Sequence, residues 1–134
     1  MRVYFIFQIK EEFKNMYNGR ESNLYQILKS IYRLSSSEVV YGYNLLRQVT
    51  IPLDKELLDR DLFVKLHAEY PYSKRDDIHY YNQLYKNEIS RLIIKKGYMR
   101  LEAEQDNSTF FDILKQYSDS FFVCDFNKLK FFFL

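Results

Sequence analysis

The chain has 134 residues, of which 47% are hydrophobic and 28% are charged, a composition typical of an ordered protein rather than a disordered one. Its 20 basic and 18 acidic residues are interspersed and give a net charge of +2, which leaves no basic stripe for a phosphate backbone and argues against direct nucleic-acid binding. This length fits a single domain, residues 1–134, that buries a core without disulfides or metal.

The chain begins with a run that is apolar on both faces, residues 3–9, and such a run favours a central strand covered on both sides. The pattern then becomes helical, with Phe13, Met16 and Tyr17 at i, i+3 and i+4 on one face. Gly19 is placed to end this helix in the left-handed conformation. The helix is then only about two turns long, so its neighbours must hold it.

Further helices are predicted in the first half of the chain. Residues 22–34 carry one apolar stripe, and Ser35 with Glu38 has the spacing of a capping box that starts a helix through about Gln48. Asp54 is a candidate cap for a short helix through Arg60. Residues 62–66 fit either a strand or the continuation of that helix.

In the second half, Asp76 and Asp77 place negative charge at the start of a predicted helix that runs to about Ile89. Residues 92–94 and 98–104 predict a hairpin, because the second segment alternates between apolar and charged residues. A helix capped by Asn107 or Ser108, through about Tyr117, and a buried strand at 121–126 follow. The apolar run 131–134 either docks on the fold, leaves an exposed patch or belongs to a longer tail.

This order of elements predicts an α/β (α+β) fold. We expect a mixed β-sheet with central N- and C-terminal strands plus a hairpin, flanked by helices. The single cysteine, Cys124, has no partner for an intramolecular disulfide. The chain opens with no signal peptide, and its apolar runs are too short to span a membrane. We therefore expect a cytoplasmic protein that does not enter the membrane.

Signals for catalysis are sparse. The three glycines are far apart, and neither His67 nor His79 has a partner at metal-ligand spacing; a solvated or half-buried imidazole is expected for His79. Asp125 lies in an apolar strand, either as a buried, hydrogen-bonded carboxylate or as a strand-end residue facing solvent. We predict no catalytic residues, no metal and no cofactor. The alternative is a small enzyme that combines Asp125 with one histidine and Arg20.

Two segments resemble one known family. The first comprises the aromatic strand, Ile9-Lys10-Glu11-Glu12-Phe13, Asn15, Tyr17 and Gly19-Arg20-Glu21-Ser22; the second runs from Phe110-Phe111-Asp112-Ile113-Leu114-Lys115 to Asp125-Phe126-Asn127. Both resemble the SirA family, the sporulation inhibitors of replication of Bacillus-type bacteria. The resemblance implies a negative regulator rather than an enzyme, with the N-terminal domain of the replication initiator DnaA as its partner.

The first helix allows two interpretations from its residues alone. Either Phe13 and Tyr17 both pack against the sheet, or Ile9 and Met16 anchor the segment while the two aromatic rings face a partner. The resemblance favours the second, because in that family an aromatic pair at these positions contacts DnaA. We therefore predict a partner-binding surface on a monomer, completed by the helix after it, with these residues: Phe13, Met16, Tyr17, Leu45 and Gln48. A small accessory domain with a different protein partner is the remaining alternative.

Overall fold

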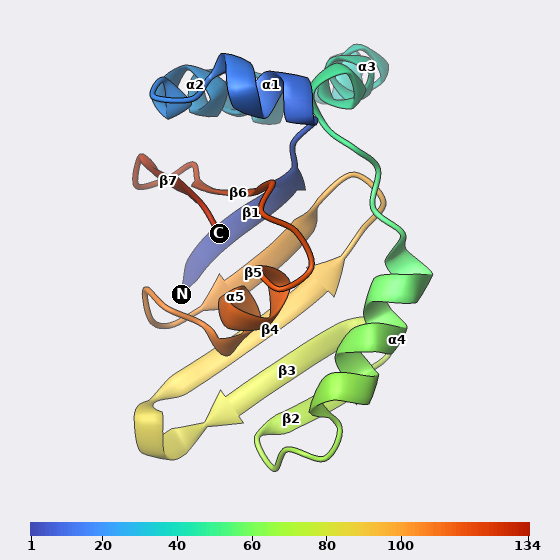
Figure 1. The fold of residues 1–134 in the computed structure, drawn as a ribbon, viewed down its shortest axis with the longest axis vertical. Helices are drawn as coiled ribbons and strands as arrows, with labels where there is room; N and C mark the ends of the chain where they lie inside the picture. Colours follow the sequence, from blue (N-terminus) through green and yellow to red (C-terminus); the bar gives the residue numbers. More distant parts are fainter.

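A seven-stranded sheet forms the centre of the computed structural model, which describes residues 1–134 (Figure 1). Four α-helices lie between the first and second strands of the chain, and a fifth lies between the fifth and sixth strands. In chain order the elements are β1 (Arg2–Gln8), α1 (Glu11–Met16), α2 (Glu21–Tyr32), the 3-10 turn η1 (Ser36–Glu38), α3 (Val39–Val49), α4 (Lys55–Leu66), β2 (Tyr72–Arg75), β3 (Ile78–Gln83), the 3-10 turn η2 (Leu84–Lys86), β4 (Glu88–Ile94), β5 (Met99–Ala103), α5 (Thr109–Leu114), β6 (Phe121–Asp125) and β7 (Lys130–Phe133).

The strand order is β2-β3-β4-β5-β1-β6-β7. The first strand, β1, pairs with β5 on one side and β6 on the other. The N-terminal and C-terminal apolar runs are therefore central strands of one sheet, as predicted, and they are also neighbours. The predicted α/β class is therefore confirmed. The sheet itself is antiparallel in every pairing rather than mixed. Short connections explain four of these pairings, β2–β3, β3–β4, β4–β5 and β6–β7, since a short loop can join only antiparallel neighbours. The pairings of β1 with β5 and β6 join segments that are distant in the sequence.

The two faces of the sheet bury different helices. Tyr4 and Ile6 point to the face that carries α4 and α5, and form part of a first core cluster. Phe7 and Ile9 point to the opposite face and join a second cluster with α2 and α3. Figure 1 shows α1, α2 and α3 gathered at one end of the molecule, away from α4 and α5. The sheet thus supports a separate three-helix layer over β1, β6 and β7.

The predicted helices of the first half are present. Ser35 contacts Glu38 through its side chain, with 2.9 Å between Oγ and Oε1, and α3 follows directly. The carboxylate of Asp54 accepts a hydrogen bond from the amide of Leu57 at 3.2 Å and so caps α4. Residues 62–66 continue this helix, which settles the alternative left open by their pattern.

The prediction of a helix from residue 76 to about Ile89 is wrong. Asp76 and Asp77 form a two-residue turn between β2 and β3, in which Asp76 has a φ of +55°. Aspartate tolerates this conformation better than most residues. The following segment alternates along β3, with His79 and Tyr81 buried in the core. Tyrosine and isoleucine favour strands, so the acidic pair belongs to a hairpin turn and not to a helix start.

The C-terminal part follows the sequence more closely. The predicted hairpin is β4 with β5, and Met99, Leu101 and Ala103 are buried as expected. Ser108 caps α5 by accepting a hydrogen bond from the amide of Phe110 at 3.2 Å. The apolar run at 131–134 docks, because β7 pairs with β6.

Candidate functional site

The short helix α1 is held from outside, as its length requires. None of its six residues is buried. The segment before it is fixed by Ile9, which is fully buried and bridges to Thr50, and by the amide of Lys10, which donates to the carbonyl of Val49 at 3.0 Å. On the other side, Lys14 donates to the carbonyl of Asp119 at 2.7 Å. These contacts hold α1 against α3 and the chain that leads into β6.

Hydrogen bonds between side chains and the backbone hold the corner after α1. Gly19 has a φ of +80°, the left-handed conformation expected for it. The side chain of Glu21 accepts a hydrogen bond from the Gly19 amide at 3.1 Å, and Arg20 donates to the carbonyl of Met16 at 3.3 Å. Arg20 and Glu21 therefore each bind a helix end rather than each other. Their local role is to fix the angle between α1 and α2.

A groove of about 510 Å³ lies where α1, α2 and α3 meet. Its lining is mostly apolar, with Ser30 and Gln48 as polar members. We call this feature the three-helix groove; its residues are Phe13, Ile27, Ser30, Ile31, Leu34, Tyr41, Leu45, Gln48 and Val49. Three of the five residues predicted for partner binding, namely Phe13, Leu45 and Gln48, line it together, although Phe13 is more than 30 positions from the other two in the sequence.

The other two predicted residues, Met16 and Tyr17, do not line the groove. Met16 is 53% exposed, so the expectation that it anchors α1 is wrong, whereas Ile9 is the buried anchor. Phe13 lies on the half-buried side of α1, whereas Met16 is turned to solvent. Phe13 and Tyr17 are half-buried and pack against the second core cluster. Each ring thus has a core side and a free side, and neither interpretation of the pair holds alone.

Sequence reasoning missed the part of this surface that α3 contributes at its start. Tyr41 lines the groove and is 60% exposed, and Val39, Val40 and Tyr43 beside it are also exposed. The signal was available, because Tyr41, Leu45 and Gln48 are spaced i, i+4 and i+7 and so share one helix face. Contiguous exposed patches of large apolar residues are typical of protein-interaction sites.

Comparison with known proteins places the chain. The sequence model of the family described as "Sporulation inhibitor of replication protein SirA" matches residues 2–134, essentially the whole chain. The chain belongs to the SirA family. A search of curated proteins found no match. Membership of the SirA family makes this chain one of a group of replication inhibitors linked to sporulation.

The residues of the alternative enzyme site do not come together in this SirA-family chain. Asp125 is buried at the end of β6, where its Oδ1 accepts hydrogen bonds from the amides of Asn127 and Lys128 at 3.0 and 3.2 Å. It is therefore the buried carboxylate that the sequence allowed, and it shapes the turn into β7. His79 lies on β3, four strand positions away in the sheet, or about 19 Å at the usual strand spacing.

The remaining members of that set are also apart. His67 is exposed at the end of α4, with its Nδ1 3.1 Å from the carbonyls of Phe63 and Val64. Arg20 occupies the corner after α1. Cys124 is buried, and burial raises the pKa of its thiol, which disfavours the nucleophilic thiolate. The structure thus assembles no constellation from these candidates.

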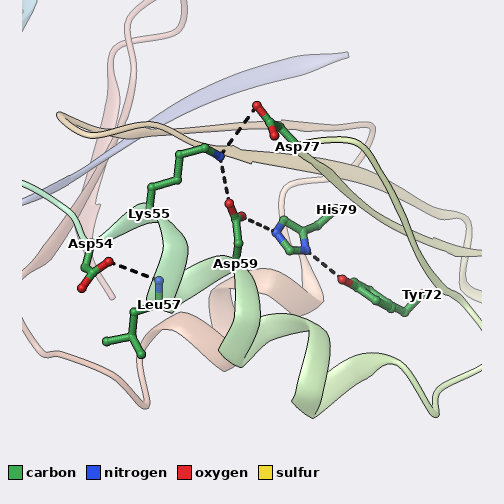
Figure 2. A network of polar contacts seen from close by, with 7 residues as sticks. All are labelled: Asp54, Lys55, Leu57, Asp59, Tyr72, Asp77 and His79. Atoms are coloured by element: carbon green, nitrogen blue, oxygen red, sulfur yellow. Dashed lines mark hydrogen bonds and ion pairs between the residues drawn. The ribbon is translucent and has the colours of Figure 1, made fainter.

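A polar cluster around the buried His79 instead joins α4 to the β2–β3 hairpin (Figure 2). His79, expected to be solvated or half-buried, is fully buried; its Nε2 lies 2.7 Å from the Asp59 carboxylate and its Nδ1 2.8 Å from the Tyr72 hydroxyl. Lys55 contacts the second oxygen of Asp59 at 2.9 Å. The expectation failed because it rested on a helix, whereas the alternation of β3 turns His79 into the core.

The charges in this cluster explain its protonation. Burial lowers the pKa of His79 below its ordinary value, against the opposing effect of Asp59. Burial alone would raise the pKa of Asp59, but hydrogen bonds from Lys55 and His79 lower it. A neutral imidazole then donates from Nε2 to the carboxylate and accepts at Nδ1 from Tyr72, whose pKa burial raises to about 12. All three groups are satisfied, so the cluster connects elements and leaves no reactive group free.

No helix is both long enough and apolar enough to cross a membrane.

Proposed function

We propose that this chain inhibits replication initiation by binding the N-terminal domain of DnaA through α1 and the face of α3 that lines the three-helix groove. The residues proposed to make contact are Phe13, Met16, Tyr17, Leu45 and Gln48. Binding would cover the surface through which that domain pairs with itself and with other proteins, without contact to DNA. The protein would act in the cytoplasm as a monomeric single domain, residues 1–134.

One observation carries this proposal. Residues far apart in the sequence, Phe13 on α1 with Leu45 and Gln48 on α3, line one groove, and the exposed Met16 lies about one helical turn after Phe13 on α1. Interfaces of modest size have such a centre, in which aromatic and apolar anchors are surrounded by a charged rim. Here the exposed Glu11 and Glu12 of the first turn of α1 provide rim charges.

The interaction is tested by titrating purified DnaA N-terminal domain into the full chain, with heat of binding as the readout. Leu45→Glu places a charge in the apolar groove, and we expect affinity to fall more than about 30-fold, since a central anchor contributes about 2 kcal/mol or more. Leu57→Glu is the matched control, because Leu57 is 41% exposed on α4, which packs on the opposite face of the sheet.

The two variants separate the possible outcomes. Loss of binding in Leu45→Glu alone, with melting temperatures that remain equal, supports the proposed surface. Unchanged binding in Leu45→Glu would place the contact elsewhere, and equal loss in both variants would show that the effect is not specific to the groove. A wild-type chain that does not bind the DnaA domain at all would favour the alternative of a different protein partner.

A further inference from the structure

A second concave site lies between the three-helix layer and the sheet. It has a volume of about 360 Å³ and is lined only by hydrophobic residues. We call it the aromatic pocket; its residues are Phe5, Phe7, Leu28, Ile31, Tyr32, Leu46, Tyr98 and Phe126. Small-molecule sites have volumes of about 300–1,000 Å³ and mostly apolar walls, so the size and lining of this pocket suit a small ligand.

Aromatic rings form most of the wall. The ring of Phe5 lies 5.0 Å from that of Tyr32, 5.7 Å from Tyr98 and 5.5 Å from Phe126, measured between centroids. Tyr32 is half exposed, so it forms part of the rim. At the roughly 30 Å³ that a water molecule occupies in the liquid, the pocket has room for a ligand of about a dozen non-hydrogen atoms.

The pocket lies where the helical cover of this sheet face ends. Phe5 pairs directly with Arg100 across β1 and β5, and the side chains of paired residues lie on the same face about 5 Å apart at Cβ. Next to Arg100 on that face are Ile93 on β4 and, beyond it, Ile78 on β3. Neither belongs to a core cluster. Arg100 thus lies next to the pocket residue Phe5, at the point where the sheet face is no longer covered by helices.

The charge beside the pocket is positive. Arg91 and Arg100 both pair with Glu102, the latter with 3.1 Å between Nη2 and Oε1. Two guanidinium groups share one carboxylate, so one positive charge stays unbalanced. The side chain of Arg100 is 40% exposed, and a guanidinium has five N–H donors, so the donors that Glu102 does not use can bind a further acceptor. Arginine binds carboxylates with charge-assisted, often bidentate hydrogen bonds.

From this geometry we propose that the aromatic pocket binds a small amphipathic carboxylate, with its apolar chain among the rings and its carboxylate on Arg100. A quaternary ammonium ligand, which aromatic cages also accept, is disfavoured here because the neighbouring charge is positive. This site is separate from the contact proposed for DnaA, since only Ile31 lines both the aromatic pocket and the three-helix groove.

The proposal is tested on the full chain with three probes that share one alkyl chain, below their micelle concentrations: decanoate, decanol and decyltrimethylammonium. Calorimetry should give saturable binding of one decanoate per chain, and decanoate should bind more tightly than the other two. No saturation up to roughly 1 mM, or tighter binding of the ammonium probe, would overturn the proposal.

Three variants locate the site. Arg100→Gln should weaken decanoate binding about ten-fold, as expected for one charge-assisted contact, and leave decanol binding unchanged. Arg75→Gln removes the same charge from the edge strand β2 and should change neither. Tyr32→Ala should weaken both ligands. Unchanged decanoate binding in Arg100→Gln or in Tyr32→Ala, with normal melting curves, would contradict the assigned site.

Discussion

The side chain of Met16 offers a direct quantitative test of the proposed DnaA-binding surface. Complete burial of a methionine side chain contributes about 1.5–3 kcal/mol. Since 53% of Met16 is still exposed in the free chain, a partner that covers it could gain about half of that, roughly 0.8–1.6 kcal/mol. Met16→Ala should therefore weaken binding of the DnaA N-terminal domain by about 4- to 15-fold.

The same substitution should leave the fold intact. Alanine has a higher helix propensity than methionine, and the hydrogen bond from Arg20 goes to the backbone carbonyl of Met16, so truncation does not remove it. Thermal melting of Met16→Ala should match that of the wild type. Val64→Ala is the control, because Val64 is 61% exposed on α4 and should not affect binding.

The assay is a calorimetric titration of the DnaA domain into each variant. An affinity of Met16→Ala within two-fold of the wild type, at unchanged stability, would refute the inclusion of α1 in the contact. Equal weakening by Val64→Ala would show that general surface hydrophobicity, and not this surface, drives association.

Three further predictions concern the fold that supports this surface. Phe13→Ala should lower both DnaA binding and the free energy of unfolding, the latter by about 2 kcal/mol, since the ring is half-buried; unchanged urea unfolding would show that the ring has no core role. Ser108→Ala should cost about 1 kcal/mol in the same assay through loss of the α5 cap, and a midpoint equal to the wild type would contradict it. Acidification should lower stability, because the folded pKa of His79 is below its ordinary 6.5: the unfolded state takes up the proton first as the pH falls below about 6.5. Asp59, whose folded pKa is also lowered, adds a loss below about pH 4; a flat profile from pH 7 to 5, or an unchanged profile in His79→Gln, would contradict the account.

Local signals in the sequence predicted much of the fold. Both central strands are recognisable as runs that are apolar on both faces, and Gly19, Asp54 and Ser108 mark helix ends by chemistry that acts within a few residues. These signals do not depend on distant parts of the chain. They therefore survive in the structure with shifts of only a few residues.

The segment around β3 could not be predicted in the same way. Ile78, Tyr81 and Tyr85 satisfy helical spacing, but the alternation of β3 is stabilised by contacts that are distant in sequence. His79 finds Asp59 on α4, 20 positions earlier, and Tyr72 on the neighbouring strand. A buried histidine needs such partners, and no local pattern announces them.

The candidate surface was only partly visible from the sequence for a similar reason. The resemblance of the first helix to the SirA family drew attention to α1, and helical spacing drew attention to Leu45 and Gln48. That α2 closes the groove between them, with Ile27 and Ile31 in its wall, depends on the angle fixed at the Gly19 corner. Tertiary packing of this kind is not encoded in the periodicity of any one helix.

The central claim is that α1 and α3 form the contact surface for the DnaA N-terminal domain. The most direct test is to follow the backbone amide resonances of the isotopically labelled full chain while unlabelled DnaA domain is added. We predict saturable changes at Phe13, Met16, Leu45 and Gln48, with the amides of α4 and the β2–β3 hairpin unchanged. Absence of any change, or changes confined to α4 and that hairpin, would contradict the claim.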